Sequence, residues 1–294
     1  MRNLFNNDRF RKMYIAHLKT IIDENFANLD YIDSANKIYY IIDQSVLLDT
    51  NKFYSYLNFQ NNLDSTVNNI IDYPGIKDLM YNRTNYLNNY LGFNHTIIID
   101  SVLASSNNLL IGDDLWISAY VADASEVILF YRFDNNGIFQ EVQMFDNGNN
   151  NDGLAGDFTY GAKIPKIGNQ TQYYIYAENN ISGQFSPERA AYEFYEYITP
   201  INYGDLVINE FLAINNNVVQ DEFGDFSDWI ELYNNTNSTL SIHELYLSDN
   251  DSNLLKWNLP NMSIKSDEYL ILWADEKADQ SNLHTNFKLS SNGE

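Results

Sequence analysis

The sequence predicts a multidomain protein in which an N-terminal helical segment is followed by two immunoglobulin-like β-sandwiches. Apolar residues recur every three or four positions over residues 1–94, and they alternate with polar residues from about residue 95 onward. Basic and acidic residues number 9 and 10 over residues 1–94, 4 and 14 over residues 95–200, and 4 and 16 over residues 201–294. Because periodicity and charge change together, we place domain boundaries after residues 94 and 200.

The helical segment is predicted to contain four helices. Asn7 is a plausible N-cap of the first helix, Ser34 caps the second, and the aromatic stretch from Phe53 to Phe59 forms a third. Pro74 and Gly75 are expected to end the preceding stretch and to begin the last helix. The apolar stripes expected to pack together are Phe10, Met13, Tyr14, Leu18, Ile21 and Ile22, then Ile38, Ile41, Ile42 and Val46, then Ile76, Leu79, Met80, Arg83, Leu87 and Tyr90.

The middle segment shows the two-residue period of half-buried strands, separated by turns rich in Asn, Asp and Gly such as Asn135-Asn136-Gly137. Short strands at regular spacing are typical of a sandwich of about seven strands. The alternating residues are Ile97, Ile99 and Val102, then Leu115, Ile117, Ala119 and Val121, then Val127, Leu129 and Tyr131, then Tyr174, Tyr176 and Glu178.

Composition excludes several classes of function. The 294 residues carry a formal net charge of −23, which disfavours binding to nucleic acid phosphates or anionic lipids and favours cations. The chain has no cysteine, so disulfides and thiolate metal sites are impossible. No run of about 18 apolar residues indicates a transmembrane helix. The N-terminus also lacks the apolar core of a secretory signal.

The last third of the chain contains a series of short motifs: Asn209-Glu210-Phe211, Asp228-Trp229-Ile230-Glu231-Leu232-Tyr233-Asn234, Leu247-Ser248-Asp249, Trp273-Ala274-Asp275 and the segment 283–291. In this order they resemble the lamin tail domain, an immunoglobulin-like sandwich found in nuclear lamins and in large secreted or surface-attached bacterial proteins. This resemblance implies a binding or structural module without chemistry of its own.

A second set of motifs consists of Phe10, Arg11, Tyr14 and Leu18, the segments 74–79 and 83–87, and the turns 144–148 and 152–157. Those of the first segment resemble the end of the spore coat protein H (CotH) kinase-like domain, an atypical protein kinase. In that family a sandwich with turns like these, and then a lamin tail domain, often follow the kinase-like part. Residues 1–94 contain no Gly-rich phosphate loop, lysine–glutamate pair or magnesium-binding aspartates, so no kinase activity is expected of this chain.

Both resemblances imply that the chain is a piece of a longer protein. The nucleotide-binding lobe of the kinase-like family precedes these helices, and a lamin tail domain continues with further strands. We therefore expect an open sandwich edge, with Trp257 and Trp273 less covered than core residues usually are. The expected location is extracellular or on the cell surface, with the signal peptide lost upstream.

The loop from Asp146 to Asp157 is the candidate metal site. Calcium prefers six to eight oxygen ligands, which clustered Asp and Asn side chains can supply. An ordinary long hairpin, in which these residues only adopt turn conformations, fits the pattern equally. The candidate calcium ligands are Asp146, Asn147, Asn149, Asn151, Asp152 and Asp157.

The lamin tail segment holds a second possible cation site, made of Asp221, Glu222, Asp225, Asp228 and Glu231. For Glu231, which follows Trp229 by two residues in a predicted strand, a hydrogen-bonded structural role is the competing interpretation.

Histidine and tyrosine offer two further candidates. Asp275 and His284 are predicted to form a carboxylate–histidine pair that orients the ring, which lacks the third group of a catalytic triad. His17 is expected on the first helix, at the boundary between buried and exposed positions. Exposed tyrosines, first of all Tyr173, Tyr174 and Tyr176, could stack on sugars, although tyrosine equally fills sandwich cores.

The sequence thus predicts a non-catalytic C-terminal region of a secreted or surface-attached bacterial protein. Its partners would be a protein or a glycan of the cell envelope, and no nucleic acid; the oligomeric state is left open. The alternative is a fragment of a CotH-like kinase whose nucleotide-binding lobe lies outside these residues.

Overall fold

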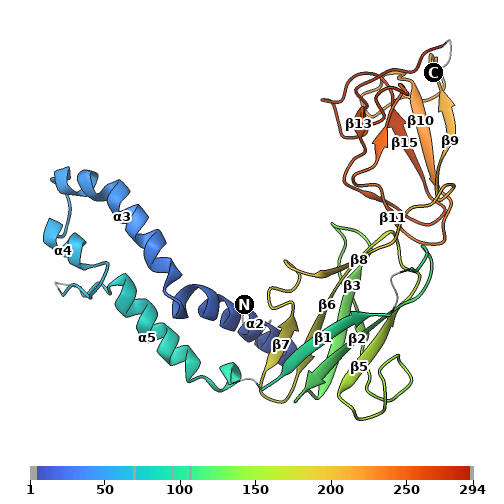
Figure 1. Cartoon of the computed structure of the whole chain (residues 1–294). Helices are drawn as coiled ribbons and strands as arrows, with labels where there is room; N and C mark the ends of the chain where they lie inside the picture. The colour runs from blue at the N-terminus through green and yellow to red at the C-terminus, as the bar shows by residue number, and fades with distance from the viewer. Residues whose placement is uncertain (1–4, 69–70, 95, 106–107, 292–294) are drawn as a thin grey trace. The chain divides into compact units, whose positions relative to one another are not determined.

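The computed structural model describes residues 5–68, 71–94, 96–105 and 108–291. A helical segment is followed by several antiparallel sheets consistent with immunoglobulin-like sandwiches, which confirms the predicted fold class (Figure 1). The chain forms two compact units, one made of residues 1–99, 121–126 and 176–193 and the other of the remaining residues. The domain boundaries after residues 94 and 200 stay predictions.

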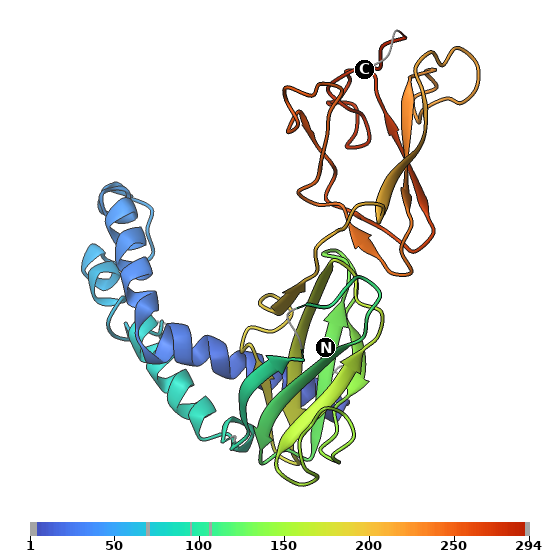
Figure 2. The same cartoon turned by 45° about the vertical axis from the view of Figure 1, so that its right-hand side comes forward.

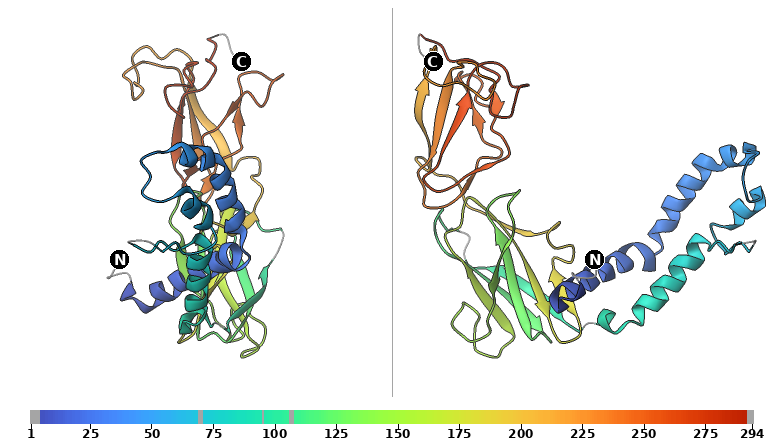
Figure 3. Two further views of the ribbon diagram at one scale, coloured as in Figure 1. Left: turned by 90° about the vertical axis from the view of Figure 1, so that its left-hand side faces the viewer. Right: turned by 180° about the vertical axis from the view of Figure 1, so that it is seen from behind.

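The helices of the first unit form a long hairpin, seen from behind in Figure 3. The short helix α4 lies between the two arms in the chain, and the first arm contains a stretch of the wider π-helix. In chain order the helices are α2 (Asp8–Ile21), the π-helix η1 (Ile22–Ala27), α3 (Asp30–Leu48), α4 (Tyr56–Asn61), α5 (Ile76–Asn88) and the 3-10 helix η2 (Leu91–Phe93).

Two of the three predicted helix starts are confirmed. The Asn7 side chain accepts a hydrogen bond from the Phe10 backbone N–H at 3.1 Å, and Gly75 directly precedes α5. The Ser34 cap is wrong, because α3 already begins at Asp30. The Asn28 side chain accepts the Asp30 N–H at 3.1 Å just before this start, whereas the N-cap residue Leu29 makes no side-chain hydrogen bond.

The apolar stripes of the helices are only partly buried. Ile15, Ile22 and Phe93 form a small core with Leu18 and Leu87 packed against it. The predicted stripe of α3 is exposed instead, with Ile38, Ile41 and Ile42 at 59, 78 and 39%. This stripe is therefore only partly covered: Ile38 and Ile42 line a hollow together with Phe59 of α4 and Ile76 of α5, while Ile41 is largely exposed.

Helix α2 packs against strand β7 (Gly183–Ser186) in the first unit (Figure 2). The buried Lys12 ammonium lies 3.2 Å from a Glu178 carboxylate oxygen, and the Tyr176 hydroxyl donates to the other oxygen at 2.8 Å. On the next turn His17 stacks on Phe185, with ring centroids 4.4 Å apart. His17 is thus a boundary residue, as predicted.

The middle segment contains two sheets. One has the order β1 (Ile98–Ala104), β2 (Leu115–Ala122) and β5 (Thr159–Ile164). The other has the order β4 (Gln140–Gln143), β3 (Glu126–Arg132), β6 (Gln170–Glu178) and β7, with β8 (Tyr195–Ile198) also pairing with β6. The predicted alternation holds in β2, where Leu115, Ile117, Ala119 and Val121 are each fully buried.

Strand β6 is buried along nearly its whole length and is paired on both sides. Tyr173, Tyr174 and Tyr176 are 5, 8 and 0% exposed. Their prediction as a sugar-stacking surface is wrong, and the core interpretation of these tyrosines holds.

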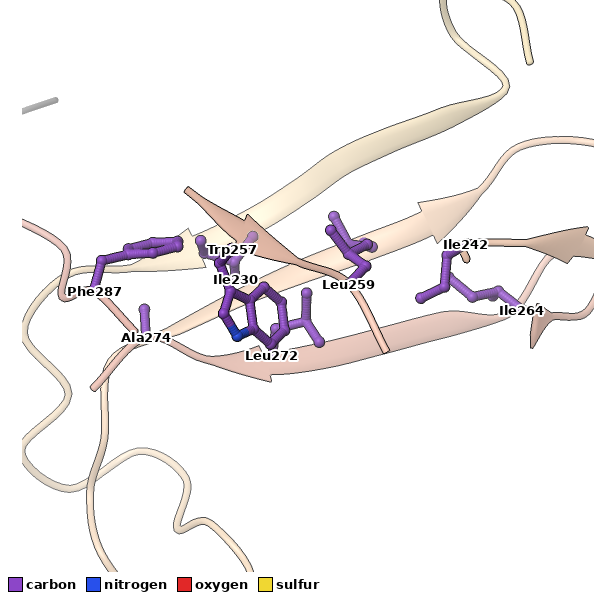
Figure 4. Close-up of a cluster of buried hydrophobic side chains, with 9 residues drawn as sticks. Ile230, Ile242, Trp257, Leu259, Ile264, Leu272, Ala274 and Phe287 are labelled. Carbon is purple, nitrogen blue, oxygen red and sulfur yellow. The ribbon is translucent and has the colours of Figure 1, made fainter. Parts of the chain in front are cut away.

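The last segment is built on a three-stranded antiparallel sheet with β10 in the centre. Its strands are β15 (Tyr269–Trp273), β10 (Trp229–Asn234) and β9 (Leu206–Leu212). Two short ribbons complete it, β11 (Leu240–Ser241) with β14 (Ser263–Ile264), and β12 (Tyr246–Leu247) with β13 (Trp257–Asn258). The core between them includes Ile230, Trp257, Leu272 and Phe287 (Figure 4).

The two tryptophans expected to be poorly covered are well buried. Trp257 is 9% exposed and Trp273 is 7% exposed. The segment after β15 supplies Phe287 to the same core, at 2% exposed. That expectation is therefore wrong.

Candidate functional site

The candidate calcium loop connects the end of β4 to β5 and is held by its own backbone. Asp152 is fully buried, and its carboxylate accepts N–H groups of Asn147, Gly148 at 2.8 Å and Asn150 at 2.6 Å. Asp146 accepts the N–H groups of two residues at the far end of the loop, Gly156 at 2.7 Å and Phe158 at 3.0 Å.

The remaining candidate ligands follow the same pattern. Asp157 accepts backbone N–H groups of Leu154 and Thr159, each at 2.9 Å. The Asn147 side chain accepts the Asn149 N–H at 3.0 Å, and Asn151 has a left-handed backbone with φ of 57°. All three carboxylates thus serve turn formation, and calcium binding by this loop stays a prediction.

These hydrogen bonds set the acidity of the loop. Burial alone raises the pKa of Asp152, but the backbone N–H donors outweigh it and hold this pKa below 3.8. The N–H groups of Leu154 and Thr159 likewise lower the pKa of Asp157. Both carboxylates are therefore ionised at neutral pH.

A second cluster lies in the last segment, residues 201–294, around the predicted Asp275–His284 pair. His284 is fully buried, and its Nδ1 lies 2.9 Å from Oδ2 of Asp275, which is 6% exposed. Asp275 lies two residues after the end of β15, and Trp273 donates its backbone N–H to the carbonyl of Leu283 at 2.8 Å. This backbone contact draws the segment with His284 alongside the end of β15, and the pair is confirmed.

Asp221 joins this pair from the loop between β9 and β10. It is 6% exposed, and its Oδ1 accepts the N–H groups of Phe223 and Asp225, each at 2.9 Å. The Ser227 hydroxyl lies 3.0 Å from Oδ2 of Asp221 and also 3.0 Å from Oδ2 of Asp275. One ligand atom of each of Asp221, Asp275 and His284 lies within 4.8 Å of the others.

Only part of the predicted acidic cluster belongs to this site. Oε1 of Glu222 lies 3.4 Å from Nε2 of His284, whereas Asp225 forms an ion pair with Lys277. Glu231 lies on β10 and accepts a hydrogen bond from the Asn209 side chain at 2.7 Å, as its structural interpretation predicts. The last member, Asp228, accepts the backbone N–H of Asn215 at 3.0 Å.

Hydrogen bonds keep the two acidic residues of the loop ionised. Burial raises the pKa of Asp221, but the N–H groups of Asp225 and Phe223 outweigh it, so the net shift is downward from 3.8. The Ser281 hydroxyl donates to Glu222 at 2.7 Å and lowers the pKa of that carboxyl below 4.5.

The role of Ser227 could not be predicted from sequence spacing. It lies six residues after Asp221 but 48 residues before Asp275, and only the completed sheet brings the two carboxylates to its hydroxyl. The available signal was the repeated occurrence of Asp in this loop, which indicated a cluster without naming its partners.

Strand β9 presents a different kind of surface. Ile208 pairs with Leu232 and Phe211 pairs with Ile230, so their side chains lie on the same face of the sheet as two buried core residues. Ile208 and Phe211 are nevertheless 55 and 64% exposed. The apolar core face therefore continues onto β9 without cover from the described residues.

Comparison with known protein families finds a similarity for the last segment. Residues 199–294 match the family model of the lamin tail domain. This domain is an immunoglobulin-like module without catalytic activity, which agrees with the sheets and core of this segment. No curated protein matches the chain. Within the described part of the chain, none of the helices has both the length and the apolar content that crossing a membrane requires.

Proposed function

We propose that this chain is a non-catalytic binding region of a secreted or surface-attached bacterial protein, and that its partner is a protein of the cell envelope. The lamin tail match over residues 199–294 carries this proposal, because that domain is a binding or structural module. Its net charge of −12, from 4 basic and 16 acidic residues over 201–294, favours a partner with a basic surface.

The β9 face is the binding surface that we propose. Ile208 and Phe211 provide exposed apolar side chains, and among the described strands β9 pairs only with β10. An extended segment of a partner can add to such an edge through backbone hydrogen bonds, while its apolar side chains contact Ile208 and Phe211. A protein partner satisfies both features, whereas a glycan offers no strand to pair.

Co-sedimentation with a bacterial envelope fraction tests this function. The untagged full chain is mixed with the intact fraction, with the same fraction after protease treatment, and with purified peptidoglycan. We expect saturable binding that protease treatment abolishes. Binding to peptidoglycan alone would replace the protein partner with a glycan, and the absence of binding to every fraction would contradict the proposal.

A second candidate function is that of a part of a CotH-like kinase. It is favoured by the exposed apolar side chains of α3, since Ile38 and Ile41 are 59 and 78% exposed on a helix that in a kinase would pack against the rest of the domain. In this case residues 1–94 complete a catalytic domain whose nucleotide-binding lobe lies elsewhere in the protein.

Thermal unfolding with and without Mg²⁺ and ATP separates the two candidates. A ligand that binds only the native state raises Tm. The binding proposal predicts an unchanged Tm, with Mg²⁺ alone as the control. A rise that requires ATP would favour the kinase candidate.

A further inference from the structure

We propose that the connection between α3 and α4 is a dimerisation surface whose partner is a second copy of this chain, held by reciprocal insertion of Phe53 into an apolar hollow. The surface belongs to the first unit and lies at the far end of the helical hairpin (Figure 1). The inference goes beyond the proposed function and does not depend on the partner of the β9 face. It rests on an exposed aromatic side chain, on the hollow beside it and on the charge of the helical segment.

The first observation is the position of Phe53. Its side chain is 95% exposed, although burial of a phenylalanine side chain is worth about 1.5–3 kcal/mol. The ammonium of the preceding Lys52 donates to the backbone carbonyls of Asp49 at 2.6 Å and Leu47 at 3.4 Å, which holds the connection against the end of α3. Phe53 therefore projects into water from a turn that is itself held in place.

The second observation is an apolar hollow of about 390 Å³ beside Phe53. Its wall is preformed: the rings of Tyr54 and Tyr73 meet edge to face with centroids 4.7 Å apart, and the backbones of Val67 and Tyr73 exchange hydrogen bonds of 2.9 and 3.0 Å. Pockets of about 300–1,000 Å³ accommodate small ligands, so an aromatic ring can enter this one. The apolar residues that line the hollow include Val46, Phe53, Tyr54, Phe59, Val67 and Tyr73.

A projecting ring and a hollow on one surface make that surface self-complementary. In a twofold pair the same surface of each chain faces the other, so Phe53 of each copy meets the hollow of its partner. Because Phe53 also lines the hollow, the two contacts lie side by side and the pair closes without leaving a site for a third chain. A small apolar molecule in the hollow would instead leave most of Phe53 in water.

The exposed apolar area is sufficient for a dimer. Leu48 and Leu57, on either side of Phe53 in the chain, are 69 and 63% exposed. Together with Leu47, Phe53 and Tyr73 they expose roughly 500 Å² of apolar surface. Since apolar atoms make up about 60% of a typical interface, this area implies about 800 Å² buried on each chain, as in interfaces of standard size.

Charge favours a second copy over other partners. Residues 1–94 carry 9 basic and 10 acidic residues, whereas residues 95–294 carry 8 and 30, so two copies meet with least repulsion through the helical segment. Asp49 and Lys52, one charge of each sign, both line the hollow. A membrane surface matches less well, because Lys52 is the single basic residue between positions 40 and 73 and the whole chain carries a net charge of −23.

Sedimentation equilibrium of the untagged full chain, at about 1–100 μM, tests the pairing. We expect a mass that rises with concentration toward twice the 34.1 kDa of one chain, with a micromolar dissociation constant. A mass of one chain at every concentration would overturn the proposal. Flotation with phosphatidylcholine vesicles runs in parallel, and vesicle binding by a chain that stays monomeric would assign the surface to a membrane instead.

Matched variants locate the contact. Phe53→Asp should weaken the dimer at least tenfold, and circular dichroism should show an unchanged fold because the side chain is so exposed. Asn58→Trp, which fills the hollow from its wall, should weaken the dimer as well. Tyr192→Asp is the control, since Tyr192 is 84% exposed outside the helices and the substitution adds the same charge. Dimerisation that both Phe53→Asp and Asn58→Trp leave intact, or that Tyr192→Asp weakens equally, would contradict the assignment.

Discussion

Asp152 shows how one buried side chain can organise a loop of a dozen residues. Its carboxylate accepts three backbone N–H groups and is fully buried, so it replaces the hydrogen bonds that these groups would make with water. The same side chain was predicted to bind calcium. A carboxylate can accept N–H groups and bind a cation together, so the two roles require separate tests.

We predict that Asp152→Asn lowers the free energy of unfolding by about 2 kcal/mol. The substitution replaces one of the two carboxylate oxygens with an NH₂ group, which cannot accept a hydrogen bond from the backbone N–H groups. Urea denaturation measures the change. Asp123→Asn is the control, since Asp123 is exposed and its left-handed backbone suits Asn. Equal stability of the two variants would show that the loop does not depend on the Asp152 carboxylate.

Asp152 should also make the stability of the folded protein depend on pH in the acid range. Because the folded pKa of Asp152 lies below its ordinary value of 3.8, its stabilising contribution is complete above about pH 3.8 and is lost as the pH falls through the folded pKa. Urea midpoints of the wild type should therefore fall more steeply below pH 3.8 than those of Asp152→Asn. Parallel curves would contradict this assignment.

We expect a second effect of pH on stability, at higher pH, from His17. Burial against Phe185 lowers the pKa of His17 below 6.5, so the unfolded chain binds this proton more readily than the folded one. Its contribution to stability is present above about pH 6.5 and decreases as the pH falls through the folded pKa. His17→Gln should flatten the stability curve in this range; a slope equal to that of the wild type would be contrary to expectation.

Among the elements, helix α2 depends on a buried ion pair. Burial lowers the pKa of Lys12, but its bonds to Asp8 and Glu178 outweigh that effect, so the net shift is upward from 10.5 and the ammonium stays charged. Tyr176 donates to the same Glu178 carboxylate, and its pKa is raised by burial and by this bond. The pair therefore fixes the position of α2 against β7.

We predict that Lys12→Met destabilises the first unit by about 3 kcal/mol, because it leaves the Glu178 carboxylate buried without its cation. The double variant Lys12→Met/Glu178→Gln should recover part of this loss, since no charge remains to be paired. Guanidinium denaturation followed by circular dichroism measures both. A single variant as stable as the wild type would show that the pair does not hold the helix.

The elements also show what the sequence could and could not predict. Local signals located Asn7 and Gly75, because a cap and a helix-opening glycine act within one turn. The Ser34 prediction failed because α3 begins at Asp30, after the N-cap residue Leu29, which makes no side-chain hydrogen bond and so leaves no cap signal in the sequence. The stripe with Ile38 and Ile41 correctly marked an apolar face, but periodicity does not reveal whether another element covers that face.

Strand β9 is the element through which we expect binding. Phe211→Asp should weaken binding to the envelope fraction at least tenfold, about 1.4 kcal/mol, because it puts a charge into the apolar contact. Leu254→Asp is the matched control, since Leu254 is similarly exposed at 69% in the same segment. If both variants bind as the wild type does, the β9 face is not the contact surface.

At the scale of the whole molecule, the sequence located the fold class and the lamin tail segment correctly, because strand periodicity and a series of short motifs extend over many residues. It also predicted the Asp275–His284 pair, which lies within nine residues. It did not join Asp221 to that pair, since the loop after β9 and the segment after β15 meet only once the sheet has formed.

The most direct test of the whole account is equilibrium binding of the full chain to the envelope fraction, measured with and without Mg²⁺ and ATP. We predict saturable, protease-sensitive binding that is the same in both conditions. Binding that appears only with ATP, or transfer of phosphate to an envelope protein by the purified chain, would contradict the conclusion that this is a non-catalytic binding region.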